Sequence, residues 1–115
     1  MFWSVDTFAT PLPDSSMGIA DLEPDFWAES LALFALGAVS PWLAMLDHAK
    51  YGRAVDKVQG LDITTIAACH SPVIEGPYID KAFAHIRALP SIVPPDLPDQ
   101  SILDQIVAAT AQPPA

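Results

Sequence analysis

Cysteine and basic residues are scarce in this chain of 115 residues. The single cysteine, Cys69, has no partner for an intramolecular disulfide, which agrees with a reducing compartment. Five Lys and Arg residues stand against 14 Asp and Glu residues, so the formal net charge is -9. A field of this sign repels phosphate groups and anionic lipid heads, and we therefore expect no nucleic-acid partner and no membrane partner.

Long hydrophobic segments are lacking as well. The longest stretch without a charged residue is 17 residues, Ser30 to Leu46, and Gly37, Ser40 and Pro41 interrupt it. A membrane-spanning helix needs about 20 apolar residues, so this stretch predicts two buried helices instead. The first residues lack the basic start and the small-residue cleavage site of a secretory signal, and we expect the chain to be cytoplasmic.

What is present is a hydrophobic fraction of 51% with 17% charged residues, a composition typical of a packed globular domain. The β-prone run 2–5 predicts a short strand, and a loop rich in proline and acid follows it. Asp25 can cap a helix that reaches about Val39. Ser40 can cap a second helix that Gly60 ends. Its predicted apolar face consists of Trp42, Met45, Leu46 and Ala49, and Ala54, Val58 and Leu61 continue a neighbouring apolar stripe.

The second half of the chain predicts one more strand and two more helices. The β-branched residues in 61–69 are typical of a buried strand that ends just before His70. Gly76 and Pro77 open a helix that closes at Leu89. The prolines of 90–98 predict an extended strap, and a short amphipathic helix that begins at Ser101 precedes the tail 112–115. These patterns predict a small, helix-rich α/β domain with two short strands.

Two short motifs lie at the ends of these two strands. The sequence Asp-Thr-Phe-Ala occupies 6–9, and Ile-Thr-Thr-Ile-Ala-Ala-Cys-His-Ser-Pro-Val occupies 63–73. With the acidic loop and the helices between them, residues 2–89 resemble the C-terminal half of a metallo-β-lactamase-fold protein of the flavodiiron, or oxygen-binding di-iron, type. Ala9 and Ser71 stand where that family has glycine.

The resemblance implies a fold and a division of the chain. Residues 1–89 would form the C-terminal half of a metallo-β-lactamase αβ/βα sandwich. Residues 90–115 would lie outside it as a Pro-rich strap with a short helix and a frayed tail.

The resemblance also implies metal ligands. Asp6 would bridge two metal ions through its carboxylate, and His70 would bind one of them through an imidazole nitrogen. Two close divalent ions need a shared anion to offset their repulsion, and neutral imidazole suits iron or zinc. The implied cofactor is a binuclear iron centre, with zinc as the alternative. From the residues alone, Asp6 is a loop or N-cap carboxylate and His70 a turn histidine.

Most of the ligands of such a centre are missing from the sequence. It contains no compact cluster of His, Glu and Asp like that of the family's first half, and no glycine-rich phosphate loop. We predict His48 and His85 to be solvated or half-buried residues in the middle of helices, without partners at metal-binding spacing. We predict Cys69 to be a buried structural residue, because neighbours on a strand point to opposite faces and its thiol would not meet the imidazole of His70.

Three functions remain open from the sequence. The first is a truncated or partial relative of di-iron oxidoreductases that handle oxygen or nitric oxide, incomplete as a catalyst without a chain that supplies the missing half. The second is a non-catalytic interaction module that forms a homo-oligomer through the apolar faces the missing half would cover. The third is a zinc-dependent hydrolase of the same fold.

Overall fold

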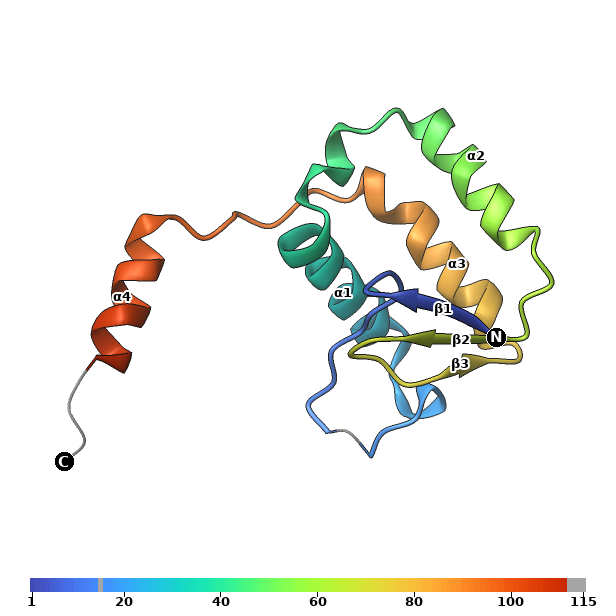
Figure 1. The fold of residues 1–115 in the computed structure, drawn as a ribbon, viewed down its shortest axis with the longest axis horizontal. Coiled ribbons are helices and arrows are strands. Elements are labelled where there is room, and N and C mark those ends of the chain that lie inside the picture. Colours follow the sequence, from blue (N-terminus) through green and yellow to red (C-terminus); the bar gives the residue numbers. More distant parts are fainter. Residues whose placement is uncertain (15, 112–115) are drawn as a thin grey trace.

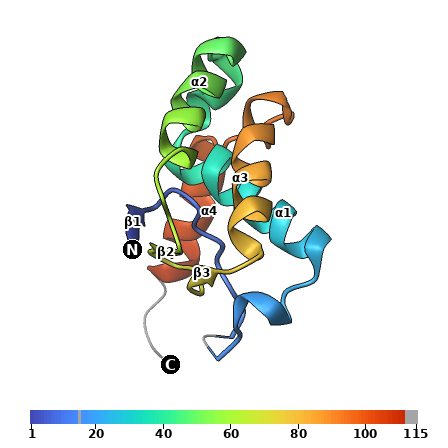
Figure 2. The same cartoon turned by 90° about the vertical axis from the view of Figure 1, so that its right-hand side faces the viewer.

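The computed structural model describes residues 1–14 and 16–111, which form a helix-rich α/β domain, as predicted. The strands of this part of the chain are β1 (Phe2–Val5), β2 (Thr65–Ala68) and β3 (Ile74–Glu75). Its α-helices are α1 (Pro24–Phe34), α2 (His48–Gln59), α3 (Tyr78–Ala88) and α4 (Gln100–Thr110). The strands lie in front of α1 and α3 in Figure 1, and Figure 2 shows the same layers from the side.

The sheet has the strand order β1-β2-β3, with β1 parallel to β2 and β2 antiparallel to β3. Ile66 pairs with Phe2 on one side and with Ile74 on the other, so these three side chains share the face that meets the helices. Trp3 and its partner Ala67 point the other way, because side chains alternate along a strand. The outward face therefore carries an exposed tryptophan, and the outer edge of β1 has no strand partner among the described residues.

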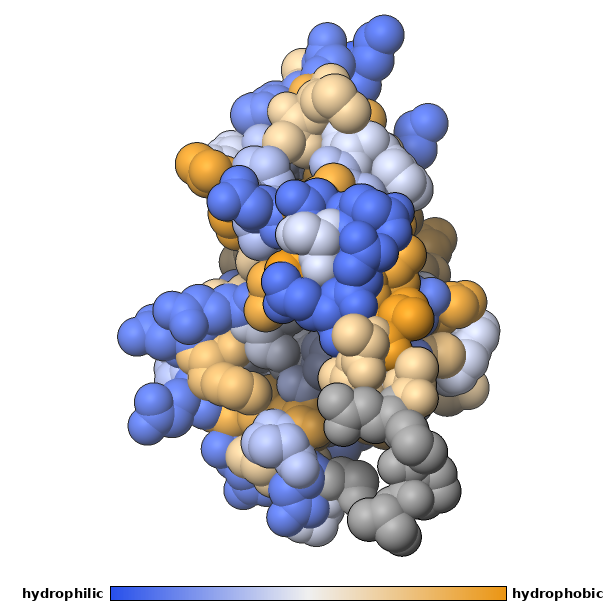
Figure 3. Space-filling model, turned by 90° about the vertical axis from the view of Figure 1, so that its left-hand side faces the viewer, coloured by the Kyte–Doolittle hydropathy of each residue, from blue (hydrophilic) through white to orange (hydrophobic). Residues whose placement is uncertain are grey.

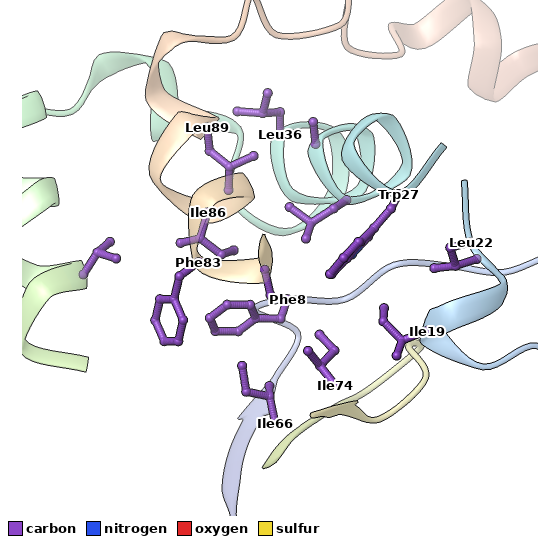
Figure 4. Close-up of a cluster of buried hydrophobic side chains, with 14 of the residues drawn as sticks. Phe8, Ile19, Leu22, Trp27, Leu36, Ile66, Ile74, Phe83, Ile86 and Leu89 are labelled. Carbon is purple, nitrogen blue, oxygen red and sulfur yellow. The ribbon is translucent and has the colours of Figure 1, made fainter. Parts of the chain in front are cut away.

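The core lies between the sheet and the helices α1 and α3. Ile66, Ile74 and Phe83 are each exposed by 1% or less. The ring of Phe8 meets that of Phe83 edge-on, with 5.1 Å between the centroids, and Trp27 of α1 faces the same cluster in Figure 4. Burying a large apolar side chain stabilises a fold by about 1.5–3 kcal/mol, so this cluster is the main source of stability.

The first predicted helix begins and ends differently in the structure. Glu23 is the N-cap in place of Asp25, because Pro24 takes the first helical position, where its missing N–H does no harm. The α-helix stops at Phe34, and one π-helical turn, Ala35–Val39, continues it to the predicted end.

The second predicted helix is divided in two. Pro41–Met45 is a 3-10 helix, and α2 starts afresh after Asp47, whose carboxylate accepts the N–H of Lys50 at 3.0 Å. The carboxylate cap fixes a new helix start, and Leu46 is extended before it. The predicted apolar face is wrong, since Leu43 is buried while the side chains of Trp42, Met45, Leu46 and Ala49 are all exposed.

The second half of the chain agrees better with prediction. β2 occupies only the second half of the predicted strand 61–69, since residues 61–64 are not in a strand. α3 follows Gly76, whose φ of +60° lies in the left-handed region that glycine favours. A 3-10 turn, Leu89–Ser91, closes α3 and buries Leu89 and Pro90. The two-residue strand β3 was not predicted, because so short a run has no recognisable period.

The last helix lies apart from the rest of the molecule in Figure 1. Asp99 is the N-cap of α4 and accepts the N–H groups of Ser101 and Ile102, so the helix starts one residue before the predicted Ser101. The predicted tail, 112–115, falls outside the described residues. Among the described helices, none is long and apolar enough to cross a membrane.

Candidate functional site

The parallel strands β1 and β2 end at the same edge of the sheet. The N–H of Cys69 donates to the carbonyl oxygen of Val5 at 2.6 Å, which continues the pairing one residue beyond β2. Asp6 follows Val5, and His70 follows Cys69. The backbone therefore brings the two predicted metal ligands to neighbouring positions, although 63 residues lie between them in the sequence.

Asp6 begins a tight turn and is half-buried. Its carbonyl oxygen accepts the N–H of Ala9 at 3.2 Å, and the N–H of Thr7 donates to Ser4 at 3.1 Å. Asp6 lines a cavity of about 190 Å³ beside the turn after α1, together with Ser40, Leu43 and Tyr51.

His70 has an unusual backbone, with a φ of +57°. A side chain costs roughly 1–2 kcal/mol in this left-handed region. The residue is exposed, and its ring meets Phe34 of α1 edge-on with 5.8 Å between the centroids. His70 lines a different cavity, of about 400 Å³, with Pro11 and Met17. Ser71, which stands where the resemblance implies a glycine, has no positive φ.

The two side chains thus line separate cavities although their backbones are neighbours, and no described residue lines both. The described residues also contain no group of three His, Cys, Asp or Glu side chains that could hold a metal ion. A structural zinc needs about four ligands, and a binuclear centre needs more. The described part of one chain therefore does not fit the binuclear iron or zinc centre that the resemblance implies.

The other two histidines, His48 and His85, belong to no group of metal ligands among the described residues. His48 is exposed, as predicted, but it is the first residue of α2 and not in the middle of a helix. His85 is half-buried on α3, also as predicted, and its ring lies 4.8 Å from that of Trp27. Burial lowers the pKa of His85, because desolvation disfavours the imidazolium. Cys69 is half-buried, so it is less buried than predicted.

A feature that sequence reasoning missed is an apolar groove of about 340 Å³ between the free edge of β1 and helix α2. We call it the β1–α2 groove; α2 contributes Tyr51, Ala54, Val55 and Val58 to it. These four positions have the i, i+3, i+4, i+7 spacing of one helix face. That spacing was the signal that could have indicated the groove.

Comparisons with protein-family models, with curated proteins and with solved structures find no match to this chain.

Proposed function

We propose that this chain is a partial metallo-β-lactamase-type domain, related to di-iron oxidoreductases that handle oxygen or nitric oxide. It supplies Asp6 and His70 as ligands and is not a catalyst on its own. A second polypeptide that carries the missing ligands would complete the site with iron, or with zinc in a hydrolase of the same fold. The proposal places the chain in the cytoplasm, where its one thiol stays reduced.

The observation that carries the proposal is the parallel pairing of β1 with β2. Ligands that follow adjacent parallel strands are held by rigid elements at one edge of a sheet, which is where a shared metal site can be assembled. The separation of the two side chains into different cavities explains why completion by another chain is part of the proposal.

The test measures iron and zinc content by elemental analysis, together with the mass of each species in solution. Asp6→Ala and His70→Ala are the test variants. Asp62→Ala and His48→Ala are matched controls, because both positions are exposed and lie away from the sheet edge. We expect metal only in an assembled fraction, and we expect both test variants, but neither control, to remove it.

Metal that survives both test substitutions would show that these residues are not ligands. Absence of metal from every species would reject the metal-site proposal.

A second candidate, a self-associating interaction module without catalysis, is favoured by the exposed apolar residues around the sheet. Trp3 and Val5 on β1 are 58% and 50% exposed, and Val73 before β3 is 52% exposed. In a sandwich fold a second layer covers such a face. A strictly monomeric chain at all concentrations in light scattering would reject this candidate.

A further inference from the structure

Helix α4 presents an apolar face that nothing in the described residues covers. Four aliphatic side chains that are 41–55% exposed share one side of the helix: Ile102, Leu103, Ile106 and Val107. None of the helix's residues is buried. Figure 3 looks onto the side of the molecule where α4 lies and shows hydrophobic groups at the surface between hydrophilic ones.

A helix of this kind is not stable on its own. It has 11 residues, and isolated helices shorter than about 12–15 residues are marginal in water. Its cap at Asp99 and the Gln100–Asp104 hydrogen bond of 2.8 Å are local and stabilise it only modestly. Most helices gain their stability by packing an apolar face, so α4 needs a surface.

The β1–α2 groove offers a surface of the right chemistry. It runs between a strand edge and a helix, and most of its lining is apolar. An amphipathic helix binds such a groove through anchors spaced i, i+3 and i+4, which is the spacing of Leu103, Ile106 and Val107.

The charges on the two elements are complementary. The basic residues of the whole sequence are confined to α2 and α3, and three of them, Lys50, Arg53 and Lys57, share a face of α2 beside the groove residue Ala54. Among the described residues, none of these three forms an ion pair. Residues 88–111 carry three aspartates and no Lys or Arg, and Asp104 lies next to the apolar face of α4.

The strap directs α4 away from its own groove. The seven residues 92–98 include three prolines, which hold the chain extended over about 22 Å at about 3.1 Å per residue. In Figure 1 the strap leads away from the body of the molecule, residues 1–91, and α4 lies on the opposite side of that body from α2. We infer that α4 of one copy docks in the β1–α2 groove of a second copy, and that the exchange is reciprocal. This inference rests on the second candidate function, self-association, and names its contact.

Reciprocal exchange closes a dimer with twofold symmetry, because each copy gives a helix and receives one. The exchange covers the apolar face of α4 and the β1–α2 groove in both copies. It also brings the acidic end of each chain to the basic face of the other, which offsets part of the repulsion between two copies that each carry a net charge of -9.

The test uses the full-length chain in sedimentation equilibrium. Ile106→Asp places a charge on the docking face, and Gln105→Asp, which adds the same charge on the polar side of α4, is its control. Ala54→Trp fills the groove, and Ala49→Trp, at an exposed position on the far side of α2, is its control. We expect each test variant to weaken dimerisation at least about tenfold and each control to change it by less than about twofold. Far-UV circular dichroism checks that the body stays folded.

Mixing the two test variants distinguishes exchange from any other contact. A mixed pair keeps one intact contact, in which the helix of the Ala54→Trp copy enters the groove of the Ile106→Asp copy, whereas neither variant alone can form one. We therefore expect dimers in the mixture that are absent from the separate solutions.

The helix exchange is overturned if the wild type forms a dimer that neither test variant weakens. It is also overturned if mixing the two test variants produces no dimer. Either result leaves self-association standing. A wild-type chain that is monomeric throughout overturns both.

Discussion

His85 couples the stability of the fold to pH. Its ring lies against Trp27, and burial lowers its pKa below the ordinary value of 6.5. The unfolded chain then binds a proton more readily than the folded one between the two pKa values. The contribution of neutral His85 to the free energy of unfolding is therefore complete above pH 6.5 and is lost as the pH falls below it.

We expect His85→Gln to flatten this fall. The measurement is urea denaturation of the variant and the wild type at a series of pH values from neutral to mildly acidic. His48→Gln, at an exposed position, is the control and should leave the slope in place. An unchanged slope in His85→Gln would mean that another group is responsible.

Asp6 and His70 show which features of the candidate site can be predicted from the sequence. The neighbouring strand ends of Asp6 and His70 agree with the predicted strands, because a β-prone run located β1 and a β-branched cluster located the end of β2. The directions of the two side chains were not predictable. They depend on left-handed backbone angles at Val5 and His70, which are uncommon for residues other than glycine and leave no signature in the sequence.

At the scale of elements, α2 is attached to α3 by polar contacts at its edge. The hydroxyl of Tyr51 donates to the carbonyl oxygen of Ile86 at 2.7 Å, and Arg87 forms an ion pair with Asp56 at 2.7 Å. The ion pair is exposed and contributes little, so the partly buried tyrosine bond matters more. Burial raises the pKa of Tyr51, although the charge of Arg87 opposes this.

Tyr51→Phe should therefore lower the free energy of unfolding by about 1 kcal/mol at neutral pH. Tyr78→Phe is the matched control, since no hydrogen bond from its hydroxyl is found in the described residues, and it should have little effect. The difference between wild type and Tyr51→Phe should shrink as the pH rises above 10, because the folded state favours the protonated phenol. If the wild type and Tyr51→Phe had equal denaturation midpoints at neutral pH, the hydrogen bond from Tyr51 to Ile86 would not stabilise the packing of α2 on α3.

The wrong helix boundary around 40–47 has its cause in packing. Local patterns located α3 and β2, where the apolar spacing and the turn residues agree, although β2 starts later than predicted. They failed around 40–47, where Ser40-Pro41 and Asp47 are both acceptable helix starts and only packing decides between them. Burial of Leu43 there draws the 3-10 turn into the core and leaves Trp42 outside.

At the scale of the whole molecule, α4 does not pack against the described part of the body, residues 1–91 (Figure 1). The radius of gyration is 16.5 Å, whereas a compact chain of similar length has about 13 Å. The excess comes from the strap and α4, which extend away from the body in Figure 1. Stability within one copy therefore belongs to residues 1–91, where the buried cluster lies.

Removal of residues 99–115 tests this separation. Since no described residue of α4 is buried, the shortened chain should unfold with the same free energy as the full chain, within about 0.5 kcal/mol, at concentrations where both are monomeric. At higher concentration the full chain should gain thermal stability through association, because binding to the folded state raises the unfolding midpoint, while the shortened chain should not. A loss of more than about 1 kcal/mol in dilute solution would mean that α4 packs on its own body. The concentration at which the two midpoints diverge would then report the affinity of one copy for another.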